Sequence, residues 1–142
     1  MHVDTILQSK GSAVHTVTAD ARISEAVGLL NTHRIGAVVV VDAKGAVAGI
    51  LSERDVVRHM LEDPARLLDR PVRDVMTAKV VTITRTASID DLMNTMTAHR
   101  IRHVPVVEKG RLVGIVSIGD VVKRKIEETE QEALALREYI AS

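Results

Sequence analysis

An internal repeat constrains the fold of this chain more than any other feature. The segment HRIGAVVVVDAKGAVAGILSERD, which begins at His33, returns from His99 as HRIRHVPVVEKGRLVGIVSIGD. His33 and His99 are 66 residues apart, whereas Asp55 and Asp120 are 65 apart, so one residue is lost between these two landmarks. The loss falls where DAKG becomes EKG, and length changes of this kind are typical of surface turns. A repeat at a fixed period predicts one supersecondary unit built twice.

The apolar pattern predicts the same elements in each repeat. A short β-rich stretch covers residues 14–17 and 80–83. A helix follows, with apolar residues at the i, i+3, i+4, i+7 spacing of a buried stripe: Ile23, Ala26, Val27 and Leu30, then Ile89, Leu92, Met93 and Met96. Two apolar strands then predict a hairpin, at 38–41 with 47–51 and at 104–107 with 112–116. A second helix is predicted to begin at Ser52 or Ser117, so the order is β-α-β-β-α, twice.

The remaining segments complete the predicted organisation. VDTIL from Val3 is loosely repeated as VRDVM from Val72, and Pro64 and Pro71 interrupt the stretch between the repeats. We therefore divide the chain into residues 1–62 (first repeat with its lead-in), 63–71 (connector), 72–126 (second repeat) and 127–142 (helical tail). A unit of roughly 60 residues buries little surface alone. The expected fold is α/β of the α+β type, with two repeats packed sheet to sheet across a pseudo-twofold axis. The duplication could serve this core alone.

Composition narrows the possible functions. Net charge is zero, and Tyr139 is the sole aromatic residue, which argues against nucleic-acid binding. No apolar run is long enough for a membrane span, and the N-terminus lacks signal-peptide features, so we expect a cytoplasmic protein. Cysteine is absent, and His99 and His103 are separated by a predicted helix end, so no metal site is expected. No catalytic motif is present, so we do not expect an enzyme.

A polar motif closes both hairpins and has two interpretations. Gly49-Ile-Leu-Ser52-Glu-Arg-Asp55 and Gly114-Ile-Val-Ser117-Ile-Gly-Asp120 share the pattern Gly-h-h-Ser-x-x-Asp, where h is apolar. The serine and aspartate could form a capping box, although that motif prefers the longer Glu or Gln. Alternatively, a helix N-terminus favours phosphate and a carboxylate can accept from both hydroxyls of a ribose. The motif alone leaves both interpretations open.

From Val3 to about Ile126 the chain resembles a tandem cystathionine-β-synthase (CBS) domain pair, or Bateman module. The resemblance rests on the repeat order, on VRDVMTAKVVTI, on IRHVPVV and on both Gly-h-h-Ser-x-x-Asp motifs. The helical tail is similar to that of small stand-alone bacterial members. The resemblance implies a non-catalytic regulatory module that binds an adenosyl ligand, such as AMP, ADP, ATP, S-adenosylmethionine or NAD(H), between the repeats.

The resemblance also implies two sites, each built from both repeats, with the aspartate on ribose, the serine toward phosphate and backbone groups beside the first strand reading adenine. The first site is predicted to contain Ser52, Asp55, Met76, Thr77, Val81, Ile101 and Arg102. The second is predicted to contain Ser117, Asp120, Lys10, His15, Ile35, Gly36 and Ala37.

The two repeats differ at positions that matter for these sites. The first has Gly36-Ala37 where the second has Arg102-His103, and Arg54 stands where the second has Gly119. By resemblance, Arg54, Arg102 and His103 supply positive charge for phosphates, and the alternative is that they are solvated surface cations. Gly36 could be small so that a base or a neighbouring chain can approach. Pro105, where the first repeat has Val39, is expected to loosen the base pocket of the second site.

Our prediction from the sequence is an adenine-nucleotide sensor that modulates a separate partner protein. The alternative is a dimerisation or scaffold module without a ligand. By resemblance we also expect a homodimer to which the tail, with apolar residues such as Ile126 and Leu134, contributes.

Overall fold

The first repeat folds into a three-stranded sheet with two helices. The computed structural model describes residues 1–141. Its first repeat contains β1 (Thr16–Val17), α2 (Ile23–His33), β2 (Ala37–Val41), β3 (Val47–Ser52) and α3 (Glu53–His59). The strand order is β1-β2-β3; β1 runs parallel to β2, and β2 runs antiparallel to β3.

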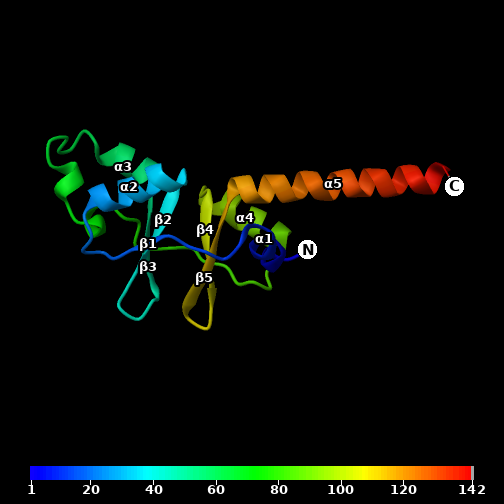
Figure 1. Ribbon diagram of the computed structural model, residues 1–142, viewed down its shortest axis with the longest axis horizontal. Helices are drawn as coiled ribbons and strands as arrows, with labels where there is room; N and C mark the ends of the chain where they lie inside the picture. The colour runs from blue at the N-terminus through cyan, green and yellow to red at the C-terminus, as the bar shows by residue number, and fades with distance from the viewer. Residues whose placement is uncertain (142) are drawn as a thin grey trace.

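The second repeat reproduces this arrangement around a two-stranded sheet. It contains α4 (Ile89–His99), β4 (His103–Glu108), β5 (Arg111–Ser117) and α5 (Ile118–Ala141). Figure 1 shows the two hairpins next to each other with their tips pointing the same way, and their helices on opposite sides of the molecule. The predicted fold class, with paired repeats and a C-terminal helix, is confirmed.

The apolar stripes predicted from the sequence build two separate cores. Ile23, Ala26 and Leu30 of α2 lie in one core, and the matching residues Ile89, Leu92 and Met96 of α4 lie in the other. Both helices end at an arginine in the left-handed region, Arg34 at φ 52° and Arg100 at φ 54°. This ending turns the chain sharply into β2 and β4, because a left-handed residue at the helix end stops the helix.

The two lead-in segments are exchanged between the repeats. Val3, Ile6 and Leu7 of α1 (Val3–Lys10) are buried in the core of the second repeat, whereas Val72 and Val75, around the short 3-10 helix η2 (Val72–Asp74), are buried in the first. Two glycines allow this close packing. A Cβ at Gly114 would lie 2.6 Å from Leu7 Cδ2, and a Cβ at Gly49 would lie 2.6 Å from Met76 Sδ. The division of the chain into residues 1–62 and 72–126 placed each lead-in with the repeat that follows it, so it did not include this exchange.

One predicted strand is missing from the second repeat. Residues 80–83 form no strand, and Ile83 makes only a single parallel bridge to Val106. In the first repeat, β1 makes two such pairs with β2, one of them to Val39. The equivalent pair in the second repeat would need an N–H from Pro105, and proline has none. The sequence prediction of a strand at 80–83 was therefore wrong, and Pro105 explains why.

The C-terminal segment is one continuous helix. Helix α5 has 24 residues, and Figure 1 shows its outer part extending away from the rest of the protein. The connector between the repeats contains only the short 3-10 helix η1 (Leu67–Asp69). Among the described residues, no helix has both the length and the apolar character that a membrane crossing requires.

Candidate functional site

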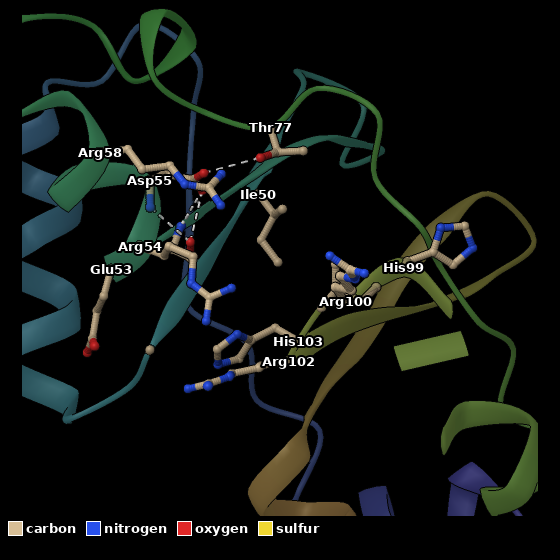
Figure 2. Close-up of a pocket in the computed structure, with 13 residues that line it drawn as sticks. Ile50, Glu53, Arg54, Asp55, Arg58, Thr77, His99, Arg100, Arg102 and His103 are labelled. Atoms are coloured by element: carbon tan, nitrogen blue, oxygen red, sulfur yellow. Dashed lines mark hydrogen bonds between the residues drawn. The ribbon is translucent and has the colours of Figure 1, made fainter. Parts of the chain in front are cut away.

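A cleft of about 590 Å³ lies between the two repeats. One wall comes from the end of β3 and the start of α3, and the opposite wall comes from the end of α4 and the start of β4 (Figure 2). It is lined by Gly36, Ile50, Ser52, Glu53, Arg54, Asp55, Arg58, Thr77, His99, Arg100, Ile101, Arg102 and His103. The cleft brings residues from both repeats together, and five of the residues predicted for the first site line it: Ser52, Asp55, Thr77, Ile101 and Arg102.

Ser52 and Asp55 form a capping box at the start of α3. The Asp55 N–H donates to Ser52 Oγ at 3.2 Å, and the Ser52 N–H donates to Asp55 Oδ2 at 2.9 Å. The aspartate side chain is therefore long enough to close the box, contrary to the argument that it is too short. Asp55 is only 8% exposed, so its carboxylate is held in one orientation at the wall of the cleft. Capping and a position suited to ligand binding coexist in the same two residues.

Thr77 joins this wall from the segment between the repeats. Its Oγ1 donates to Asp55 Oδ1 at 3.3 Å, a contact that Figure 2 draws as a dashed line. Its backbone N–H donates to Ile50 O at 2.9 Å, which fixes its position beside β3. Met76, predicted for the same site, packs instead against the core of the first repeat and Gly49. Neither Met76 nor Val81 lines the cleft.

Four arginines give the cleft its charge. Figure 2 shows Arg54 and Arg58 on α3, with Arg100 and Arg102 on the opposite wall. Within residues 1–141, none of the four makes an ion pair or a side-chain hydrogen bond. Outside the cleft, five arginines are paired with carboxylates: Arg22, Arg70, Arg73, Arg85 and Arg124. The other four, Arg34, Arg66, Arg111 and Arg137, have no ion pair within residues 1–141 but do not line the cleft. Unpaired guanidinium groups facing a common cleft are suited to an anionic ligand, because each carries several donors.

Sequence analysis predicted Arg54 and Arg102 here but missed other lining residues: Ile50, Glu53, Arg58, His99 and Arg100. Arg58 could have been found, because it follows Arg54 by one helical turn. Ile50 carries no such signal, because its apolar side chain is indistinguishable in sequence from those of its buried neighbours on β3.

His103 explains why the first repeat has a glycine at position 36. A Cβ at Gly36 would lie 2.9 Å from His103 Nε2, so the imidazole covers the Gly36 backbone. The small residue accommodates a side chain of the second repeat, rather than only a base or a neighbouring chain. Burial lowers the pKa of His103 below 6.5; nearby Glu53 opposes this shift, and the ammonium of Lys10 adds to it.

The predicted second site has a different arrangement. Asp120 and Ser117 repeat the capping contacts, at 2.8 Å for Ser117 N to Asp120 Oδ2 and 3.2 Å for Asp120 N to Ser117 Oγ. Lys10 Nζ lies 2.6 Å from the same Asp120 oxygen. Burial alone would raise the pKa of Asp120, but the hydrogen bonds from Lys10 and from Ser117 outweigh it and lower the pKa below 3.8.

Within residues 1–141, Asp120 makes a hydrogen bond or ion pair with Lys10 but with no other first-repeat residue predicted for the second site. The His15 ring stacks on His33, with ring centroids 3.6 Å apart. Ile35 packs against the core of the first repeat, and Ala37 is 5% exposed in β2. Only Gly36 of this set lines the cleft, on the side of the first site. In the described part of the chain, no group of three His, Cys, Asp or Glu side chains is placed to hold a metal ion.

Comparisons with known proteins agree with this architecture. The chain is similar to a solved CBS-domain-containing protein of Agrobacterium tumefaciens, with 49% identity, a TM-score of 0.84, and coverage of 88% of this chain and 99% of that one. It is 34% identical to a mitochondrial CBS domain-containing protein of Arabidopsis thaliana, over 97% of this chain and 71% of that one. A CBS domain protein of Pyrobaculum aerophilum, solved in complex with AMP, is 29% identical, with a TM-score of 0.75, over 84% of this chain and 89% of that one. The CBS domain family model matches residues 11–62 and 72–127. The chain therefore belongs to the CBS domain family and carries two CBS domains in tandem.

Proposed function

We propose that the cleft between the two CBS domains binds an adenine nucleotide and that the protein is a regulatory module rather than an enzyme. The observation that carries this proposal is the pairing of a fixed carboxylate, Asp55, with four arginines that lack a protein partner. A nucleotide presents both complementary chemistries, since its ribose carries a diol and its 5′ end carries phosphates.

Asp55 retains the capacity to bind a ribose hydroxyl. Its Oδ2 accepts from the N–H and the hydroxyl of Ser52, whereas its Oδ1 accepts only from Thr77. A carboxylate oxygen has two lone pairs, so Oδ1 can accept one further hydrogen bond. The hydroxyls of Ser52 and Thr77 can also rotate toward a ligand. Ile50 and Ile101 add apolar surface to the same cleft, which suits the face of a base.

The arginines define the phosphate end of the proposed site. Arg54 and Arg102 come from different CBS domains, so a phosphate held by both would bridge the two halves of the protein. Such a bridge would stabilise one relative packing of the domains over others, which is how a bound ligand shifts a conformational equilibrium. The AMP complex of the Pyrobaculum aerophilum relative supports an adenosyl ligand. ADP, ATP and NAD(H) carry the same recognisable groups.

A second part of the proposal concerns assembly. Met93 and residues of α5, including Ile118, Val122 and Ile126, line an apolar groove of about 350 Å³. Further out on α5, Leu134 and Leu136 are 57% and 58% exposed. We infer that this face is covered by a second copy of the chain in a homodimer. The regulated partner would then be a separate protein, and a cytoplasmic location stays a prediction from composition.

Isothermal titration calorimetry with AMP and ATP tests the binding proposal. Asp55→Ala should weaken binding roughly 10- to 100-fold, because hydrogen bonds to a charged group contribute about 1.5–3 kcal/mol. The matched control is Asp91→Ala. Asp91 closes an equivalent capping box with Ser88 on α4, is exposed, and does not line the cleft.

The control separates ligand binding from helix capping. Loss of binding in Asp55→Ala but not in Asp91→Ala supports the site. Absence of heat with either nucleotide, in wild-type protein shown to be folded by circular dichroism, would favour the scaffold alternative. Ser52 and Asp55 would then serve only as a helix cap.

A further inference from the structure

The two Ser-x-x-Asp motifs lie in different surroundings, although the repeats that contain them are alike. Asp55 contacts the neutral hydroxyl of Thr77 and lines the cleft. Asp120 instead binds the ammonium group of Lys10, and neither Ser117 nor Asp120 lines that cleft. The difference lies in what each lead-in segment brings to the carboxylate.

Lys10 makes the same pair of contacts that Thr77 makes in the first half. The Thr77 N–H donates to Ile50 O at 2.9 Å while its hydroxyl contacts Asp55. Lys10 Nζ donates to Ile115 O at 3.0 Å while it binds Asp120 at 2.6 Å. Ile50 and Ile115 are 65 residues apart and hold equivalent positions in the two repeats. One lysine side chain therefore reaches the same carbonyl position and the same aspartate position that a backbone N–H and a hydroxyl reach on the other side. It binds Asp120 Oδ2, which also accepts from the Ser117 N–H, whereas Thr77 binds Asp55 Oδ1.

Local secondary structure explains why only one lysine is in this position. The lead-ins align with Val3 matching Val72, an offset of 69 residues, so the counterpart of Lys10 is Lys79. Helix α1 continues to Lys10, whereas the equivalent chain leaves its 3-10 helix at Asp74 and pairs Thr77 with Ile50. Lys79 is exposed and has no ion pair within residues 1–141. The same residue type thus reaches the carboxylate in one half alone.

The contact between Lys10 and Asp120 competes with a nucleotide for the carboxylate. The side chains of Lys10 and Asp120 are 34% and 22% exposed, so their ion pair is partly shielded from water. A ribose diol at this carboxylate would have to compete with the ammonium, which already neutralises the charge of Asp120. The His103 ring also covers Gly36, a residue predicted for this second site. Two side chains of the protein, those of Lys10 and His103, therefore already contact residues predicted for the second site.

We propose that Lys10 closes the second half-site, so that each chain binds one nucleotide in the Asp55 cleft and removal of the Lys10 ammonium creates a second binding site at Asp120. This inference rests on the proposed nucleotide function. It differs from the sequence prediction, in which Lys10 is itself a ligand-binding residue of the second site.

Counting bound AMP by calorimetry tests the inference. Wild-type protein should bind one AMP per chain, and Lys10→Met, which keeps the aliphatic stem without the charge, should bind two. Lys79→Met is the matched control and should still bind one AMP per chain. Lys10→Gln provides a second variant that keeps a donor for the Ile115 carbonyl and should also bind two. Thermal unfolding of each variant verifies that it is folded.

Each outcome separates this inference from the proposed function. One AMP per chain in wild type and in both folded Lys10 variants overturns the inference and leaves the proposed function intact. If wild-type protein binds two AMP per chain and Lys10→Met binds one, Lys10 is a ligand-binding residue. That result also overturns the inference. No binding by wild type contradicts the proposed function. In that case one AMP bound by Lys10→Met still supports closure by Lys10, and none overturns it.

Discussion

At the scale of single residues, the cleft combines anchored and unanchored charges. Asp55 is buried and held by three hydrogen bonds within the protein, so its position does not depend on a ligand. Arg54, Arg58, Arg100 and Arg102 have no such anchor within the described residues. The carboxylate is thus prepared in advance, whereas the arginines remain available for phosphates.

The arginines predict a preference for more highly charged nucleotides. Arg102→Ala should weaken ATP binding more than AMP binding, by roughly tenfold in Kd for ATP, because each lost charge-assisted hydrogen bond acts on a more negative group. Titration calorimetry at fixed ionic strength measures both affinities. Arg111→Ala removes an exposed arginine outside the cleft and serves as the control. Equal loss for AMP and ATP would show that Arg102 does not contact the additional phosphates.

His103 predicts a pH dependence of stability. Burial lowers its pKa in the folded protein below 6.5, so the unfolded chain takes up a proton at a higher pH than the folded one. The free energy of unfolding should therefore fall as the pH drops from about 7 through 6.5 and below. Urea denaturation at several pH values between 7.5 and 5.5 measures this. His103→Gln should flatten the trend, and His2→Gln, at an exposed position, should not. Parallel curves for wild type and His103→Gln would contradict this explanation.

The cleft contains more of the residues predicted for the first site than of those predicted for the second. Ser52, Asp55 and Arg54 lie in one motif, so their proximity follows from a strand running directly into a helix. Asp120 and Lys10 are 110 residues apart, and nothing in the local pattern says that Lys10 neutralises the carboxylate. That contact depends on how far α1 continues before it ends at Gly11, which is a matter of tertiary packing.

At the scale of secondary structure elements, hairpins and helices follow the sequence pattern, and the exception has a specific cause. Pro105 removes one backbone donor and with it the strand predicted at 80–83. The end of α5 could be predicted as helical but its partner could not. Figure 1 shows this part of the helix extending away from the rest of the protein, and Leu134 and Leu136 on it are exposed.

The exposed face of α5 predicts a change in oligomeric state on substitution. Ile126 is 54% exposed and lines the groove between α4 and α5. Ile126→Glu should shift a homodimer toward monomer, because a charge in an apolar interface loses its hydration. Light scattering coupled to gel filtration measures the mass. Leu61→Glu, at a position 92% exposed on the first repeat, is the control. A wild-type monomer, or an unchanged dimer in Ile126→Glu, would contradict the assignment of this face.

At the scale of the whole molecule, the exchanged lead-ins make the two CBS domains interdependent. Each core contains residues from the segment that precedes the other repeat. The two similar lead-in sequences were visible in the sequence, but which core each one joins was not. The sequence spacing of the two lead-ins does not determine which of the two domains each lead-in packs against.

The exchange predicts that a change in α1 destabilises the second domain. Leu7 is 3% exposed and packs over Gly114, so Leu7→Ala should lower the free energy of unfolding by about 2–5 kcal/mol. Leu136→Ala, on the exposed part of α5, should change it by less than about 0.5 kcal/mol when measured below the concentration for self-association. Chemical denaturation followed by circular dichroism compares them. A similar small effect for both would show that α1 contributes little to the core.

The most direct test of the central claim is a crystal structure of the protein grown with AMP at saturating concentration. We expect electron density for one nucleotide per chain in the cleft, with the ribose at Asp55 and the phosphate among Arg54 and Arg102, and with the Lys10–Asp120 ion pair unchanged. Density for the nucleotide at Asp120 with Lys10 displaced, or an empty Asp55 cleft in protein shown by calorimetry to bind AMP, would contradict this account.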